Sequence, residues 1–250
     1  MRRFRQRPEL PAATSAKLRE KTQEILQIPA AGDARKQRAR QIYEASRQTD
    51  WFEPIVTVLR GLCGAGELCM YCSSNEPSQI EHFRPLATFP ELALEYQNYL
   101  WSCDICNRTH KGERFPPDTE PGEAILNPLE DDVWEHFFIE ENFGRLLCRV
   151  DPITKQRLPR AASTCDVVGI DRENVQTKRT RRYLNLRRYA QRSLLELQAG
   201  TLDVAALRSE LADWRSEPFQ ADVADYFLNG PGRVKEPFSS VLRAVGEAVP

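Results

Sequence analysis

Two Cys-x-x-Cys pairs, separated by 30 residues, are the feature that most limits how this chain can fold. The chain has seven cysteines, and an odd number argues against a complete framework of disulfide bonds. A Cys-x-x-Cys turn directs both thiolates to one point, and four thiolates complete the tetrahedral site of structural zinc. We therefore predict one structural Zn²⁺ ion here, the alternative being buried core cysteines at chance spacing. The predicted ligands are Cys69, Cys72, Cys103 and Cys106.

The composition limits the classes to which the chain can belong. Its 250 residues are 41% hydrophobic and 28% charged, which is typical of a globular protein, and the net charge is only −1. Any nucleic-acid binding must therefore come from local basic patches. The chain has no apolar run of about 18 residues, and no apolar stretch of a secretory signal follows its basic N-terminus. We expect a cytoplasmic protein without a membrane partner.

Helical patterns flank the cysteine segment on both sides. After a basic N-terminal arm, residues 14–60 are predicted to be helical, and a helical pattern returns from about residue 171. Two apolar runs within residues 133–150 indicate a β-hairpin. The residues expected to start helices are Thr14 or Ser15, Asp33, Asp171, Asp203, Pro218 and Pro237. We expect one compact unit with an arm and helices over 1–60, a zinc-bound finger over 61–116, a loop and hairpin over 117–170, and helices over 171–250.

Between and directly after the cysteine pairs lie the groups that a metal-dependent nuclease needs. Phosphodiester hydrolysis requires a base for the attacking water and a cation at the scissile phosphate. His82 offers the base, while Glu81 and Asn107 offer the oxygen ligands that Mg²⁺ prefers. Neighbouring residues of a regular strand point to opposite faces, so a local irregularity is needed to bring Glu81 and His82 to one site. A hydrogen-bonded core histidine is the structural alternative for His82.

The order of these residues resembles the HNH endonuclease motif, also called the ββα-metal finger. The motif residues are Glu81-His82, Asn98 and Cys103-x-x-Cys106-Asn107. The resemblance implies that His82 is the general base and that Asn98 holds the loop that orients it. It further implies that Glu81 and Asn107 bind Mg²⁺ or Mn²⁺ and that Lys111 contacts phosphate. The implied fold class is α+β and mainly α-helical, with a zinc-stapled finger embedded in N- and C-terminal helices.

The residues around the motif are similar to those of PtuB-type HNH proteins over about residues 60–140. The similar segments are Ile80-Glu81-His82-Phe83-Arg84-Pro85, Asn98–Cys103, Lys111–Pro116 and Ile125–Pro128, with Asp131, Asp132 and His136. This resemblance implies the effector nuclease of a Septu or retron antiphage system, acting on DNA or tRNA. The implied partners are a PtuA-type ATPase and, in a retron, a reverse transcriptase with its DNA/RNA product.

Residues 178–192 form the best candidate for a phosphate-binding surface. They hold seven basic residues with two interleaved tyrosines, and no acidic residue occurs from Asn174 to Leu195. A solvated basic face or a protein-docking face is an equal alternative. His110 is expected to be a solvated helix residue rather than a catalytic one, and His136 is expected to have a structural or supporting role. The predicted substrate contacts, including those next to the motif, are Arg84, Lys111, Arg114, Lys178, Arg179, Arg181 and Arg182.

Three functional hypotheses stay open at this point. The first is a zinc-stapled HNH endonuclease. The second is a zinc-knuckle module that binds nucleic acid or a protein without cutting it. The third is a nuclease that is silent until its ATPase partner releases it. Glu81, His82 and Asn107 discriminate the first hypothesis from the second, because a binding module does not need them.

Overall fold

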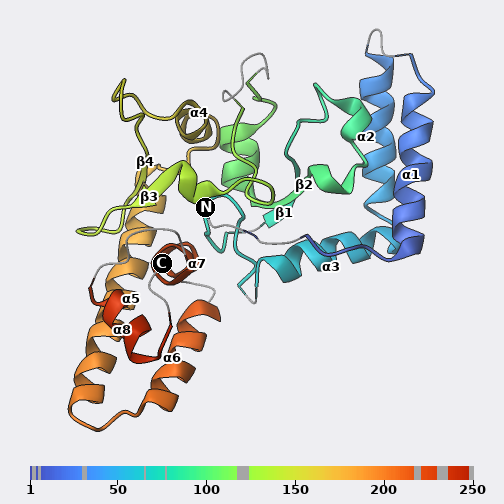
Figure 1. Cartoon of the computed structure of the whole chain (residues 1–250). Coiled ribbons are helices and arrows are strands. Elements are labelled where there is room, and N and C mark those ends of the chain that lie inside the picture. The colour runs from blue at the N-terminus through green and yellow to red at the C-terminus, as the bar shows by residue number, and fades with distance from the viewer. Residues whose placement is uncertain are drawn as a thin grey trace.

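A computed structural model of the chain describes residues 1, 4, 7–29, 33–64, 66–76, 78–116, 124–216, 221–229 and 236–247. The fold is mainly helical, with two small two-stranded antiparallel sheets (Figure 1). The buried hydrophobic side chains of the described residues form one core cluster with members from near both ends of the chain. The predicted mixture of many helices and few strands is confirmed. The division at residues 60, 116 and 170 stays a prediction.

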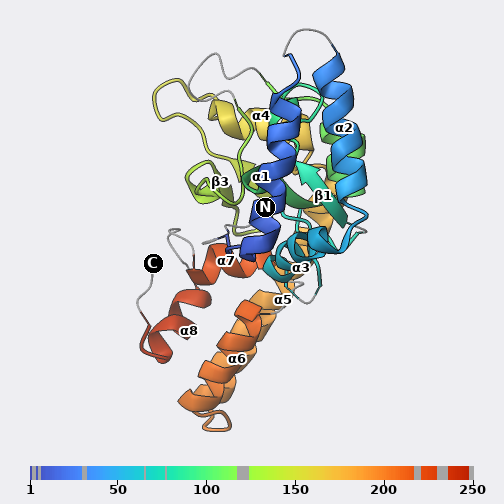
Figure 2. The same ribbon diagram turned by 90° about the vertical axis from the view of Figure 1, so that its right-hand side faces the viewer.

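Three helices form the N-terminal part, and α1 (Ala12–Leu26) and α2 (Ala34–Ser46) lie side by side (Figure 2). The predicted cap at Thr14 or Ser15 is wrong, because α1 already begins at Ala12 and the Thr14 hydroxyl donates to the Trp51 carbonyl instead (3.2 Å). Asp33 does precede α2, although its side chain makes no capping hydrogen bond. After the short turn η1 (Asp50–Phe52), α3 (Glu53–Leu62) packs its apolar face into the core.

The cysteine segment folds as two strands followed by a helical turn. Strands β1 (Ser78–His82) and β2 (Tyr99–Cys103) are antiparallel, and His82 pairs with Tyr99. The connection contains the 3₁₀ turns η2 (Pro90–Leu92) and η3 (Tyr96–Asn98). A π-helical segment, η4 (Ile105–Lys111), follows β2 almost at once. All five residues of β2 are buried, so this strand forms the centre of the segment.

A hairpin and an unexpected helix follow. Strands β3 (Phe137–Ile139) and β4 (Leu146–Cys148) confirm the predicted hairpin, and the turn η5 (Val133–Glu135) precedes them. Helix α4 (Pro159–Val168) lies in a region predicted to hold only a loop and the hairpin. Its ends carried a usable signal, because proline in the first turn and Gly169 after the last residue mark a helix start and stop.

The C-terminal part consists of α5 (Glu173–Gln198), α6 (Val204–Ser216), α7 (Ala221–Asn229) and α8 (Phe238–Ala244). Helices α5 and α6 form a long pair that extends away from the rest of the molecule (Figure 2). The predicted cap at Asp203 is confirmed, since its carboxylate accepts from the Ala206 amide (2.7 Å). Asp171 is not a cap, because Arg172 holds that position at α5. Pro237 directly precedes α8, and Pro218 lies outside the described residues.

Among the described helices, none combines the length and the apolar character that crossing a lipid bilayer requires.

Candidate functional site

Four cysteines converge in the core where β2 passes into η4. The sulfur atoms of Cys69, Cys72, Cys103 and Cys106 all lie within 4.8 Å of one another, and all four residues are buried. A zinc ion with four Zn–S bonds of about 2.3 Å requires sulfur separations of about 3.8 Å. The Cys72 and Cys103 sulfurs are 3.8 Å apart. The cluster therefore has the size and the ligand chemistry to hold one metal ion, as the spacing predicted.

Local backbone turns bring the sulfurs together. In the first pair, the Cys69 amide donates to the Ser74 carbonyl and the Ser73 amide donates back to the Cys69 carbonyl, both at 2.9 Å. In the second pair, the chain turns from β2 into η4, and the Cys106 amide points to the Cys103 sulfur (3.5 Å). The Arg172 guanidinium also donates to the Cys106 sulfur (3.4 Å), which places a positive charge beside the thiolates. Sequence reasoning gave no sign of this arginine.

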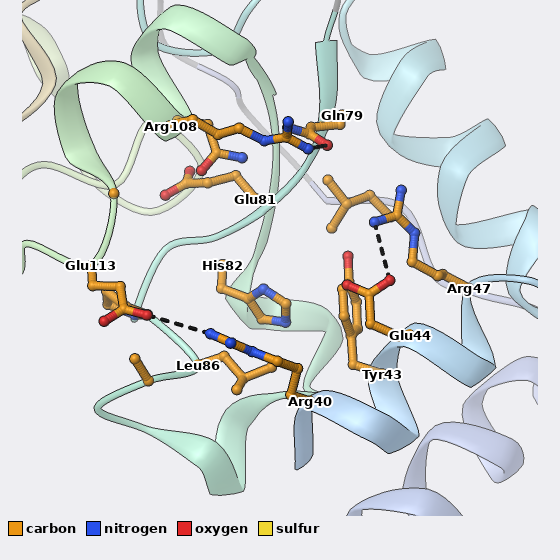
Figure 3. Close-up of a pocket in the computed structure, with 15 residues that line it drawn as sticks. Arg40, Tyr43, Glu44, Arg47, Gln79, Glu81, His82, Leu86, Arg108 and Glu113 are labelled. Carbon is orange, nitrogen blue, oxygen red and sulfur yellow. Dashed lines mark hydrogen bonds and ion pairs between the residues drawn. The ribbon is translucent and has the colours of Figure 1, made fainter. Parts of the chain in front are cut away.

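A pocket of about 330 Å³ opens between α2, the end of β1 and η4 (Figure 3). Glu81, His82 and Asn107 all line it. Glu81 and His82 both line the pocket although they are neighbours, and β1 keeps its regular pairing with β2 through His82, so the expected irregularity is not found within the strand. The structure thus brings together three of the four motif residues that are not cysteines, while Asn98 does not line this pocket. It also adds a wall that the motif did not include, formed by α2.

The His82 ring is held by one carbonyl and two aromatic rings. Its Nε2 atom lies 2.9 Å from the Ala93 carbonyl, which can only accept, so Nε2 carries the proton and the neutral ring has its lone pair on Nδ1. The ring meets Tyr43 and Tyr99 edge-on, with centroids 4.5 and 5.2 Å away. Burial lowers the pKa of His82 to about 4, assisted by the charges of Lys111 and Arg47 and opposed by the Ala93 bond. His82 is therefore neutral at pH 7.

Glu81 and Lys111 form a buried ion pair next to His82. The Lys111 ammonium lies 2.6 Å from Glu81 Oε1, and the side chains are 1% and 2% exposed, respectively. The same ammonium donates to the His82 carbonyl (3.0 Å). Burial raises the pKa of Glu81, and the Lys111 charge opposes that rise. Lys111 was expected to contact phosphate. In the structure its ammonium is buried and forms an ion pair with Glu81.

The Glu81 carboxylate has an oxygen without a well-formed hydrogen bond, although the buried Tyr71 hydroxyl lies beside the carboxylate. Its Oε2 atom is buried and has no hydrogen-bond partner among the described residues. An unpaired buried carboxylate oxygen is costly unless a cation or a donor satisfies it. Asn107 lines the same pocket and offers an amide oxygen. The donor set thus fits a hard divalent cation such as Mg²⁺ or Mn²⁺.

Asn98 closes the loop that carries the His82 acceptor. Its Oδ1 accepts from the Arg84 amide (2.7 Å), and its Nδ2 donates to the carbonyls of Arg84 (3.0 Å) and Leu92 (3.2 Å). Ala93 is the next residue after Leu92, and its carbonyl is the hydrogen-bond partner of the His82 ring. The arrangement agrees with the orienting role that the resemblance implies for Asn98, and that role stays a prediction.

Most of the predicted substrate contacts are engaged within the protein. Arg179 is fully buried and donates to Asp222 (2.8 Å), and Arg182 binds the other oxygen of Asp222 (2.7 Å). Lys178 pairs with Glu76 (2.7 Å). Of the four predicted cations on α5, only Arg181 is an exposed residue. It lines a different pocket, together with residues of α5 and of the β4 region. The basic stretch of α5 therefore supports the fold to a large extent, because its cations neutralise acids that are distant in sequence.

The two arginines next to the motif also have internal contacts. Arg114 donates to the Val167 carbonyl (2.8 Å) near the C-terminal end of α4. Arg84 lies over the rings of Phe89 and Phe115, 5.3 Å from each centroid. His110 and His136 do not line the pocket.

The cations that do line the pocket were not predicted. They come from α2, from its C-cap and from η4. The signal that could have revealed Arg40 and Arg47 is their spacing of seven residues, which is two turns of a helix. The pocket-lining side chains that sequence reasoning missed are Arg40, Tyr43, Glu44, Arg47 and Arg108.

Comparison with known proteins places part of the chain near the PtuB-type proteins. The chain is 34% identical over 119 residues to Septu protein PtuB of Bacillus mycoides (strain KBAB4), which covers 38% of this chain and 40% of the relative. It is 33% identical over 73 residues to Septu protein PtuB of Bacillus thuringiensis, which covers 27% of this chain and 26% of the relative. It is 35% identical over 81 residues to Protein ea31 of Escherichia phage lambda, which covers 32% of this chain and 26% of the relative. The matches thus span less than half the length of these curated relatives. No family model matches the chain.

Proposed function

We propose that this chain is a metal-dependent HNH endonuclease that hydrolyses phosphodiester bonds of DNA or tRNA. The observation that carries the proposal is the pocket that Glu81, His82 and Asn107 line together, with His82 neutral and its Nδ1 lone pair available. The order of β1, β2 and η4 is the order of the ββα-metal finger. A binding module that does not cut nucleic acid has no need for a neutral histidine and an unpaired carboxylate oxygen in one pocket.

His82 performs the proton transfer in this proposal. Its Nδ1 atom takes a proton from water, and the resulting hydroxide attacks the phosphorus. The Ala93 carbonyl, at 2.9 Å from Nε2, stabilises the positive charge that the ring then carries. Tyr43 and Tyr99 hold the ring plane from two sides, so the base does not have to be reoriented during the reaction. The products carry a 5′-phosphate and a 3′-hydroxyl.

Two metal ions are proposed, with separate roles. The four cysteines would hold structural Zn²⁺. Glu81 through Oε2 and Asn107 would hold Mg²⁺ or Mn²⁺, which supplies charge stabilisation to the leaving 3′ oxygen when bound. Lys111 fixes Glu81 from the opposite side through Oε1. The carboxylate is thus oriented before any divalent ion arrives.

The biological setting is proposed from the similarity to Septu PtuB. We infer that the chain is the effector of an antiphage defence system and acts in the cytoplasm with a PtuA-type ATPase. A retron reverse transcriptase with its DNA/RNA product is a further partner in systems of that kind.

The test is cleavage of plasmid DNA and of bulk tRNA in Mg²⁺ or Mn²⁺, with and without the ATPase. Wild type and His110→Ala are expected to cut one of these substrates, and His82→Ala is expected to lose at least 100-fold in rate. His110 is the matched control because it belongs to η4 but does not line the pocket. Equal cutting by wild type and His82→Ala would remove His82 as the base. Tight binding without cutting, with the ATPase present, would favour the zinc-knuckle binding module.

A further inference from the structure

Helix α2 lies outside the two strands and the helical turn, yet it forms one side of the pocket. Three of its residues and Arg47, the C-cap that follows it, line the pocket at positions i, i+3, i+4 and i+7. These positions share one face of an α-helix. The residues are Arg40, Tyr43, Glu44 and Arg47. The face of α2 that meets His82 thus carries a cation at each end and an aromatic ring between them.

The two arginines reach to different sides of His82. Their Cα atoms are about 10.5 Å apart, because they are seven residues apart on a helix that rises about 1.5 Å per residue. Figure 3 shows the Arg40 guanidinium extending past His82 toward Glu113, while the Arg47 guanidinium lies on the far side of Tyr43. Two cations placed in this way match successive charges of a linear polyanion better than they match one phosphate group.

Both guanidinium groups are available for a new partner. Arg40 is 61% exposed and lies 3.4 Å from Glu113, and Arg47 is 37% exposed and lies 3.7 Å from Glu44. Exposed ion pairs of this length contribute little stability, so a phosphate can replace the carboxylate at small cost. Guanidinium and phosphate then form shorter, charge-assisted hydrogen bonds. The buried Arg179 and its neighbour Arg182 lack this freedom, since Asp222 holds both.

We infer that α2 is the substrate-binding wall of the pocket and that Arg40 and Arg47 contact nucleic-acid phosphates on the two sides of the scissile bond. The inference rests on the proposed nuclease function and names its binding residues. Arg108 of η4 faces the same pocket and adds a third cation from the opposite wall. Tyr43 lies on the same helix face, with its ring edge-on to His82 at a centroid distance of 4.5 Å.

The test measures binding without cleavage. All proteins carry His82→Ala. The probes are fluorescein-labelled single-stranded DNA, duplex DNA and tRNA. The fluorescence anisotropy of each probe is measured at salt concentrations from about 50 to about 300 mM. Each lost phosphate contact lowers the slope of log K against log salt by about 0.7 on a single strand and about 0.9 on a duplex. Arg40→Ala with Arg47→Ala is therefore expected to lower the slope by about 1.4–1.8 on the bound probe, with at least about tenfold weaker binding at low salt.

Arg38→Ala is the matched control. Arg38 is an exposed arginine of the same helix (51%) that does not line the pocket. The Arg38→Ala variant should leave the slope of log K against log salt unchanged. The double variant Arg40→Lys with Arg47→Lys should keep most of the wild-type slope, because both positive charges remain. An unchanged slope in the double alanine variant, or an equal loss in Arg38→Ala, would overturn the inference. Residual cutting in the His82→Ala background would instead count against the proposed base, while the binding result for α2 would stand.

Discussion

The buried pair of Lys111 and Glu81 gives the sharpest quantitative prediction. Lys111→Met keeps much of the side-chain volume but leaves the Glu81 carboxylate without its counter-charge, 2% exposed in the core. Breaking a buried ion pair by removing one partner costs about 3–5 kcal/mol. The lost hydrogen bond to the His82 carbonyl adds about 1 kcal/mol. Because Glu81 can take up a proton and so relieve part of this cost, we expect about 3 kcal/mol at pH 7.

The assay is a double-mutant cycle in urea with Glu81→Gln and Lys111→Met. Glu81→Gln should cost a similar amount, because it leaves the Lys111 ammonium buried. The double variant removes both charges and should cost less than either single variant, with a coupling energy of at least about 2 kcal/mol. In a chain of this size, a loss of about 3 kcal/mol corresponds to a melting temperature lower by roughly 6–12 °C.

The pH dependence of this cycle has a definite sign. Burial raises the pKa of Glu81 above its ordinary value, and loss of the Lys111 charge raises it further. Between the unfolded and the folded pKa, the folded state then binds more protons, so stability increases as the pH falls. Lys111→Met should therefore be less destabilised at pH 5 than at pH 8. Additive single effects that do not vary with pH would refute the pairing.

Three further predictions concern the metal cluster and His82. A strong chelator that removes the cysteine-bound ion should lower the melting temperature and the far-UV circular dichroism signal, and readdition of Zn²⁺ should restore both. An unchanged melting temperature in protein shown to be metal-free would contradict a structural role of the ion. Cys103→Ser should reduce soluble yield more than His82→Ala does, since the thiolate is expected to support folding and the imidazole is expected to support catalysis; equal yields would argue against separate roles. The stability that the neutral His82 ring contributes is complete above pH 6.5 and is lost as the pH falls toward its folded pKa of about 4. Wild type should thus lose about 1.6 kcal/mol relative to His82→Gln between pH 6.5 and 5, and parallel urea curves over that range would exclude the lowered pKa.

Local spacing predicted the parts of this molecule that local geometry controls. The Cys-x-x-Cys turns and the hairpin around Gly144 depend on a few adjacent residues, and both have their expected form. The internal contacts of the α5 arginines could not be predicted for the opposite reason. Asp222, which holds Arg179, lies 43 residues further along the chain, and no pattern within α5 indicates it. The same limit hid Arg40 and Arg47, because their place beside His82 depends on how α2 packs against the connection between β1 and β2.

The cysteine cluster and the pocket are joined through short, stiff segments, and this predicts how loss of the metal would spread. Cys103 ends β2, the strand that pairs with β1 and so fixes His82 opposite Tyr99. Cys106 precedes Asn107, and the same helical turn ends at Lys111, which holds Glu81. Disorder at the cluster would therefore reach both proposed metal ligands and the base through one strand and one turn. A Cys106→Ser protein that stays folded should accordingly bind Mn²⁺ more weakly at the pocket, even though none of the pocket residues has changed.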